Sequence, residues 1–275
     1  MDLFQSIILG LLQGLTEFLP ISSSGHILIL PALLGWEDPG AAFTAVIQLG
    51  TELAVLLYFR KDLWAIGRDW TGALFRPELR GGLNVRMGWY LIAATIPIAI
   101  LGLAFENQIE TAARNLWLVA SMLIVFGIVL GLADRFGKRS RDVDQLSFRD
   151  GVLIGFAQSL ALIPGVSRSG ATISAGLALG LERAAAARFS FLLAIPAVVL
   201  SGFFQLYGIL SGEEAVGEPL INVAIATLVA FVSGYAVIAW LLRYLANHSY
   251  GIFVGYRILL GAAVLILLAT GTISN

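Results

Sequence analysis

The chain has 275 residues, of which 58% are hydrophobic and only 13% are charged, and its formal net charge is −1. A soluble domain carries about twice this share of charged residues, so the composition and the repeated apolar runs predict an integral membrane protein. The lack of cysteine excludes disulfides and thiolate metal sites, and no basic patch with interleaved aromatic residues suggests nucleic-acid binding.

Six apolar segments approach the about 20 residues that a helix needs to cross a bilayer. They are residues 41–59, 88–105, 116–133, 185–208, 219–242 and 252–270. Two other regions, 3–35 and 148–181, are interrupted by Pro, Gly and Ser, and their second arms, 27–35 and 172–181, span only about half of the membrane. We therefore predict that each region folds as a re-entrant helix–loop–helix hairpin with its polar tip near the midplane.

The basic residues support this layout. They are concentrated in two long loops, at 60–86 and 135–149. Two predicted spans separate these loops, so the loops share a side, which the positive-inside rule makes cytoplasmic. Arg183 and Arg188 lie on that side only if the second interrupted region turns back instead of crossing, and Arg257 is assigned to the same side.

Each half of this layout is one hairpin followed by three spans, and because three is odd the second half is inverted. We predict a single membrane domain, residues 1–275, with repeat halves at about 1–134 and 147–275 and a basic cytoplasmic linker at 134–149. Both termini then lie outside, as does an acidic loop at 213–218. The predicted fold class is an all-α polytopic membrane protein with an inverted-topology repeat and six spans, an architecture that surrounds midplane sites in many transporters.

Two polar motifs, residues 13–26 and 158–172, lie at the predicted hairpin tips and repeat at an offset of 145 residues. The matching residues are Gln13 and Gln158, Leu15 and Leu160, Ser22 and Ser167, Ser24 and Ser169, and Gly25 and Gly170. Inverted hairpins bring their tips together, so we interpret the two motifs as the walls of one site.

Glu17 is the main functional candidate of the first motif. It shares a helix face with Gln13, and a carboxylate near the bilayer centre costs roughly 2.5–3.5 kcal/mol, so a partner is expected. That partner is a divalent cation, Arg168 or His26; the alternative is a purely structural ion pair. His26 lies beside a carboxylate and a serine cluster, which favours catalysis over a structural role.

The second motif offers the Arg168 guanidinium, three hydroxyls and backbone N–H groups at a helix N-terminus. Phosphate oxygens need such donors. Together the motifs suit phosphoryl transfer, with a nucleophile or base on one side and a phosphate clamp on the other. The sequence shows no cage of carboxylates and histidines, so a metal would be held partly by the phosphates of the substrate.

These motifs resemble the undecaprenyl-diphosphate phosphatase family (BacA/UppP type), with Glu/Gln-x-x-x-Glu, Phe-Leu-Pro-x-Ser-Ser-x-Gly-His and Pro-Gly-x-Ser-Arg-Ser-x-x-Thr. Residues 46–50, 189–196 and 256–257 extend the resemblance over nearly the whole chain. It implies hydrolysis of undecaprenyl diphosphate to undecaprenyl phosphate and inorganic phosphate, which recycles the lipid carrier of cell-wall synthesis and confers bacitracin resistance. It further implies a Mg²⁺ or Ca²⁺ requirement and a site open to the outer face of the bacterial cytoplasmic membrane.

The resemblance also implies roles for single residues. Glu17 is the metal ligand or general base, Ser23 the nucleophile or a phosphate-binding hydroxyl, His26 the general acid/base or the nucleophile, and Arg168 the diphosphate ligand. The implied substrate-binding residues are Gln13, Ser22, Ser24, Gln48, Ser167, Ser169 and Thr172. Gln13 is the glutamine variant of its motif position, which argues against schemes that need two carboxylates there.

Three questions stay open. Glu52 lies four residues after Gln48 in a predicted span, and it either faces the site or pairs with Arg168 or a hydroxyl. The alternative function is a polyprenyl-phosphate translocase that uses the same midplane site, because fold does not fix function. The oligomeric state is also undetermined, with a homo-oligomer as one alternative.

Overall fold

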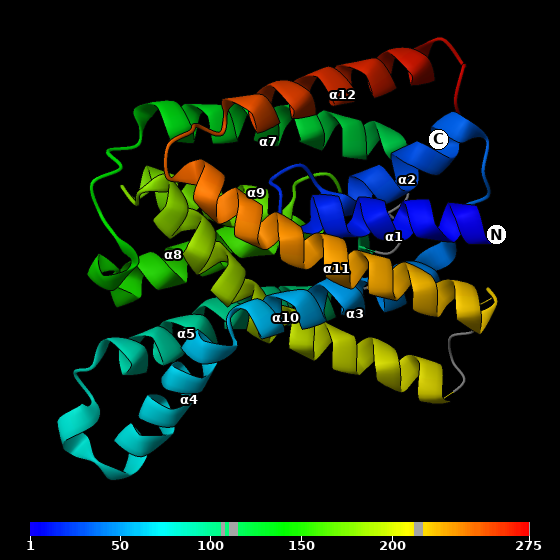
Figure 1. The fold of residues 1–275 in the computed structure, drawn as a ribbon. Coiled ribbons are helices and arrows are strands. Elements are labelled where there is room, and N and C mark those ends of the chain that lie inside the picture. Colours follow the sequence, from blue (N-terminus) through cyan, green and yellow to red (C-terminus); the bar gives the residue numbers. More distant parts are fainter. Residues whose placement is uncertain (106–107, 110–114, 212–216, 275) are drawn as a thin grey trace.

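The structure, a computed structural model, describes residues 1–105, 108–109, 115–211 and 217–274. Their regular elements are helices, with one isolated β-bridge between Arg141 and Leu181. Most of the acidic loop predicted at 213–218 lies outside the described residues. The two ends of the chain lie at the same end of the bundle (Figure 1).

Five described helices are long and apolar enough to cross a membrane, and a bent helix pair adds a sixth candidate. In chain order the elements are α1 (Leu3–Glu17), α2 (Ser23–Leu34), α3 (Gly40–Tyr58), α4 (Arg60–Phe75), η1 (Pro77–Leu79), α5 (Leu83–Ala104), α7 (Leu116–Phe136), η2 (Val143–Gln145), α8 (Phe148–Ser159), η3 (Leu160–Leu162), α9 (Arg168–Ala178), α10 (Arg183–Ser211), α11 (Leu220–Leu245) and α12 (Gly251–Ala269). The predicted spans correspond to α3, α5, α7, α10, α11 and α12. The prediction of an all-α polytopic membrane protein is confirmed.

The expectation of a loop over residues 60–86 is wrong for its first part. Residues 60–75 form α4, which turns by 70° from α3. The many charged residues suggested a loop, but they share the helix with apolar residues at helical spacing: Ile66 and Ala73 are buried, and Trp70 stacks edge-on against Trp89 of α5. A charged segment with one apolar face forms a surface helix.

Both interrupted regions form helix hairpins, α1–α2 and α8–α9, as predicted. Their second arms begin earlier than expected, at Ser23 and Arg168 instead of 27 and 172. The reason is that Ser22 and Ser167 act as N-caps and start the helix immediately after the turn.

Each hairpin packs against a helix from the other half of the chain. A Cβ added to Gly10 of α1 would lie 2.3 Å from the carbonyl oxygen of Ala226 in α11, and one added to Gly155 of α8 would lie 2.5 Å from that of Ala94 in α5. Gly10 and Gly155 are 145 residues apart, so the same small residue permits the same close approach twice. Figure 1 shows α1 beside α11, and α7 beside α12.

Candidate active site

The two hairpin turns have the same local geometry. Ser22 and Ser167 have φ values of 74° and 72°, a region that costs a non-glycine residue about 1–3 kcal/mol. Each serine Oγ accepts a hydrogen bond from the N–H of the glycine three residues later, at 3.4 Å for Gly25 and 3.2 Å for Gly170. The turns place the next residues, Ser23 and Arg168, at the first helical positions, where both line one cavity.

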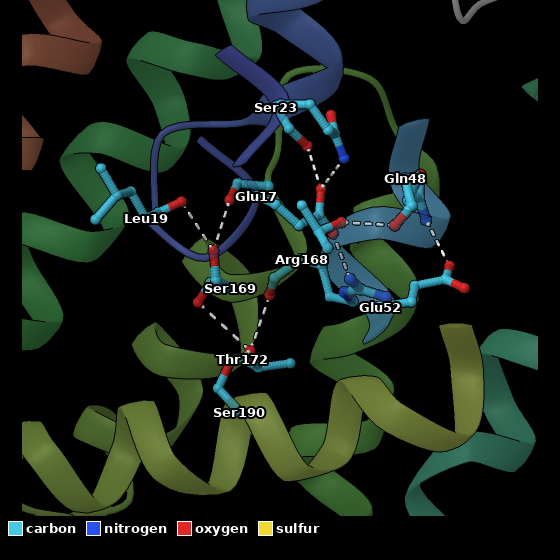
Figure 2. A network of polar contacts seen from close by, with 12 residues as sticks. Glu17, Leu19, Ser23, Gln48, Glu52, Arg168, Ser169, Thr172 and Ser190 are labelled. Carbon is cyan, nitrogen blue, oxygen red and sulfur yellow. Dashed lines mark hydrogen bonds and ion pairs between the residues drawn. The ribbon is translucent and has the colours of Figure 1, made fainter. Parts of the chain in front are cut away.

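Glu17 is the centre of the polar network between the hairpins (Figure 2). Its Oε2 accepts hydrogen bonds from Ser23 Oγ at 2.6 Å and from Gln13 Nε2 at 3.1 Å. Its Oε1 lies 2.5 Å from Nη2 of Arg168. The side chains of Glu17 and Arg168 are only 9% and 19% exposed, so little water screens this pair. Of the partners expected for Glu17, the structure provides Arg168.

A cavity of about 610 Å³ lies over this network. Its polar end consists of Glu17, Ser22, Ser23, Ser24, Gln48, Ser167 and Arg168. Its other wall is mostly apolar and comes from α5 (Thr95, Ile98, Ala99, Gly102, Leu103), η3 (Ala161, Leu162) and α10 (Ala197, Leu200). Leu103 and Leu200 are 71% and 56% exposed, so the apolar wall continues to the outside of the bundle. A ligand that fits must have a polar head and an apolar body.

Ser169 and Thr172, expected as substrate donors, do not line this cavity. Ser169 Oγ donates to the carbonyl of Leu19 in the opposite turn at 3.1 Å. The hydroxyl of Thr172 donates to the carbonyl of Arg168 at 2.8 Å and lies 2.6 Å from Ser190 Oγ of α10. Both hydroxyls fix the second turn against its surroundings. Gln13 is 1% exposed and likewise lies outside the cavity lining.

His26 does not line the cavity. Its Nδ1 lies 2.7 Å from the carbonyl oxygen of Ser22, to which it donates, and its Nε2 lies 2.7 Å from the hydroxyl oxygen of Tyr256. The two rings are stacked with centroids 5.5 Å apart, and His26 is 6% exposed. In this arrangement the imidazole orients the first turn; its predicted catalytic role stays a prediction.

Gln48 lines the cavity, whereas Glu52 does not. Gln48 Nε2 donates to Glu52 Oε1 at 3.3 Å, the same amide-to-carboxylate bond over four residues that joins Gln13 to Glu17. Glu52 is 7% exposed, and Gly202 of α10 leaves room for its second oxygen, since a Cβ there would lie 2.8 Å from it. Its hydrogen-bond partner in the described structure is Gln48, not Arg168 or a hydroxyl.

Arg257 is the site residue that the sequence analysis missed, having assigned it to the cytoplasmic side. It is fully buried in α12. Its guanidinium donates to the carbonyl of Pro20 in the first turn at 2.8 Å, and to those of Gly165 and Val166 in the second turn at 2.9 and 3.0 Å. Two further bonds reach carbonyls of α7. The sequence did contain a signal for this role, because a lone arginine within an apolar segment indicates a functional position inside the membrane.

A divalent cation such as Mg²⁺ or Ca²⁺ needs several oxygen ligands. Among the residues that the structure describes, there is no group of three or more His, Cys, Asp or Glu side chains that could hold a metal ion. The cavity does present the carboxylate of Glu17 and the amide of Gln48, which are oxygen ligands of the kind that Mg²⁺ and Ca²⁺ take. These residues fit a cation that completes its ligand shell with phosphate oxygens of a substrate.

The chain is similar to known proteins over its whole length. A family model described as "Bacitracin resistance protein BacA" matches residues 6–263. A relative from Nocardioides sp. is 58% identical over 274 residues, or 99% of each chain. One from Mycolicibacterium smegmatis is 54% identical over 278 residues, covering 100% of this chain and 99% of the relative, and one from Pseudarthrobacter chlorophenolicus is 53% identical over 276 residues, covering 100% of both. All three are named undecaprenyl-diphosphatase.

Proposed function

Because the chain belongs to the bacitracin resistance protein BacA family, we propose that it hydrolyses undecaprenyl diphosphate to undecaprenyl phosphate and inorganic phosphate. The observation that carries this proposal is the set of Ser23, Glu17 and Arg168 at the polar end of a cavity with an apolar wall. The reaction recycles the lipid carrier of cell-wall synthesis. Loss of free undecaprenyl diphosphate in this way is the proposed basis of bacitracin resistance.

The cavity suits an amphiphilic substrate. The diphosphate fits the polar end, within reach of the Arg168 guanidinium and of the backbone N–H groups at the start of α9, which bind anions well. The prenyl chain lies along the apolar wall and leaves between Leu103 and Leu200 into the bilayer. A lipid of this length cannot leave the membrane, so the enzyme brings its polar groups to membrane depth.

The geometry favours Ser23 over His26 as the attacking group. Ser23 Oγ lies in the cavity and already donates its proton to Glu17 at 2.6 Å, the arrangement of a nucleophile with its base. Oγ attacks the terminal phosphorus, the bond to the bridging oxygen breaks, and undecaprenyl phosphate leaves. The serine proton passes to Glu17. Water then cleaves the phosphoserine, releasing phosphate and returning the proton to Ser23.

Arg168 balances the charge during this sequence. In the free protein it neutralises Glu17. When the diphosphate enters, the guanidinium is positioned to contact its oxygens, where a planar bidentate donor stabilises the charge of the transferring phosphoryl group. The bond to Arg168 thus keeps the carboxylate correctly oriented until substrate arrives, and Gln13 supports the same orientation from α1.

We also propose a Mg²⁺ or Ca²⁺ ion in this site, held by Glu17 and Gln48 together with substrate phosphates. When bound, it would neutralise phosphate charge that Arg168 alone leaves uncompensated. The protein is proposed to lie in the bacterial cytoplasmic membrane with both termini and the cavity mouth on the outer face. The basic α7–α8 connection then lies in the cytoplasm, as the positive-inside rule requires.

The test is phosphate release from undecaprenyl or farnesyl diphosphate by the purified full chain in detergent. Ser23→Ala, Glu17→Gln and Arg168→Lys are each expected to lower kcat by at least about 10³-fold, the scale of losing a nucleophile or an oxyanion donor. The matched control is Ser233→Ala, since within the described structure this serine on α11 bonds only to carbonyls of its own helix. Full activity of Ser23→Ala would overturn the assignment of the nucleophile.

A trapped phosphoenzyme separates the two candidate nucleophiles, because phosphoserine survives acid and phosphohistidine does not. We expect an acid-stable adduct at Ser23 that persists in His26→Gln. The translocase alternative predicts no phosphate release by folded protein, together with transfer of a labelled polyprenyl phosphate across vesicles. Release without transfer would exclude that alternative as the main activity.

A further inference from the structure

The surface of α4 carries a regular row of exposed side chains that no other part of the described structure covers. Arg60, Trp64, Arg68, Thr71 and Phe75 are all exposed and follow one another at the three- and four-residue spacing of a single helix face. Trp64 is 73% exposed and Phe75 is 86% exposed. Large aromatic side chains this open to the surroundings are unusual on a helix that also carries many charges.

The opposite face of α4 is fully occupied. Ile66 and Ala73 are buried, Leu63 packs against the main core, and Trp70 contacts Trp89 and Gly88 of α5. Figure 1 shows α4 and the start of α5 extending away from the other helices. Apart from Arg60, which donates to the carbonyl of Leu57 at the bend, the exposed row does not take part in packing α4 against the described helices.

The charge on this row is positive. Both acidic residues of α4 are engaged: Asp62 forms an ion pair with Arg188 of α10, and Asp69 accepts hydrogen bonds from Asn84 at 2.7 Å and Arg68 at 2.9 Å. These bonds, that from Asn84 first, hold the pKa of Asp69 below its ordinary value. Arg60 of the row and its exposed neighbour Lys61 have no carboxylate partner among the described residues, so their charge is uncompensated.

The bend at Phe59 gives this face its orientation. The apolar α3 is predicted to span the membrane, and the charged α4 turns by 70° from it. A helix at this angle to a span runs closer to the plane of the bilayer than to its normal. Basic side chains that flank aromatic ones are typical of helices lying in the membrane–water interface, where the aromatic rings enter the acyl boundary and the cations meet lipid phosphates. Two independent observations, the direction of the helix and the composition of its free face, thus agree.

We propose that α4 lies in the membrane interface and binds anionic phospholipid headgroups through Arg60 and Lys61, with Trp64 and Phe75 inserted at the acyl boundary. This surface is separate from the catalytic cavity, whose lining includes no residue of α4. Its occupant is a bulk anionic lipid, and the proposal does not depend on the proposed phosphatase activity.

The first test places Trp64 relative to the membrane. The full chain is reconstituted in nanodiscs whose lipids carry bromine near the headgroup or near the end of the acyl chain, and its fluorescence is compared with that of Trp64→Phe, because the chain has 6 tryptophans. The difference signal is expected to be quenched more strongly by bromine near the headgroup. A difference signal that neither brominated lipid quenches would overturn the proposal. Either water or a second copy of the chain would then cover α4, and a concentration-dependent dimer would identify the second copy.

The second test measures lipid preference. Competition between phosphatidylglycerol and phosphatidylcholine for the detergent-solubilised chain is read by native mass spectrometry. Arg60→Gln/Lys61→Gln is expected to lower the preference for the anionic lipid by up to about fivefold per charge, or about 1 kcal/mol each. The control Lys138→Gln/Arg149→Gln removes the same charge from the α7–α8 connection and the first turn of α8. It is expected to change the lipid preference less than about twofold, within the small effect of exposed charges. An equal loss in both variants would overturn the assignment to α4.

Discussion

Replacing Arg257 by methionine should damage catalysis through the position of the two turns. The guanidinium supplies donors to three turn carbonyls, those of Pro20, Gly165 and Val166, whereas its two acceptors on α7 lie within a regular helix. An unsatisfied buried acceptor costs about 1–3 kcal/mol, so the three carbonyls together lose about 3–9 kcal/mol. Part of this is offset, because the variant no longer buries a cation.

We therefore expect the arrangement in which the two turns meet to become less stable by about 3 kcal/mol in net free energy. This corresponds to a decrease of about two orders of magnitude in rate. Arg257 does not line the cavity, so the effect should appear mainly in kcat, with a smaller change in KM. Arg257→Lys keeps the charge and up to three donors, so we expect it to recover part of the lost rate.

The assay is steady-state phosphate release by both variants, together with their unfolding temperatures in detergent. The Met variant should unfold at a lower temperature, and the Lys variant should lie between it and the wild type in both measurements. A Met variant with wild-type kcat would refute the reasoning, since it would show that the carbonyls of the two turns find other donors at no cost.

Three further predictions concern packing, backbone and cation. Gly155→Ala should lower the unfolding temperature, because its methyl group would lie 2.5 Å from Ala94. Gly67→Ala has open space around it and should stabilise α4 by about 0.5–1 kcal/mol. Equal shifts of the unfolding temperature in the two variants would contradict the close approach of α8 to α5. Ser167→Val should destabilise the fold by about 1–3 kcal/mol, because residue 167 has a positive φ. Ser167→Gly should destabilise it by less, and thermal unfolding of both variants measures the difference. EDTA should abolish phosphate release, and added Mg²⁺ should restore it. In a binding test without turnover, Mg²⁺ together with the diphosphate analogue methylenediphosphonate should raise the unfolding temperature of the wild type but not of Glu17→Gln.

The elements with strong local signals were predictable. The interruptions by Pro, Gly and Ser placed both hairpins, and the membrane cost of a carboxylate required a partner for Glu17. Sequence alone could not choose Arg168 from the three candidates, because the choice depends on how two turns 145 residues apart meet. It did not separate the residues that line the cavity, such as Ser23, from those that fix the turns behind it, such as Thr172.

Two other misses have the same physical origin. Arg257 was assigned to one side of the membrane by a rule for charges in loops, but in α12 its charge is satisfied by backbone carbonyls, which no side-chain pattern reveals. Residues 60–75 were assigned to a loop because they are charged, although their apolar residues fall on one helix face. In both cases the tertiary partner decides the meaning of the residue.

The exchange of packing partners between the halves has a consequence for biosynthesis. α1 rests on α11, and the cation that neutralises Glu17 lies 151 residues further along the chain. A ribosome makes about 5–20 residues per second, so the first hairpin exists for many seconds before Arg168 has been translated and longer before α11 is available. During that interval a carboxylate without its counterion is costly at membrane depth. The first hairpin should therefore remain near the membrane surface, or beside an insertion factor, and reach its final depth only when the second half arrives.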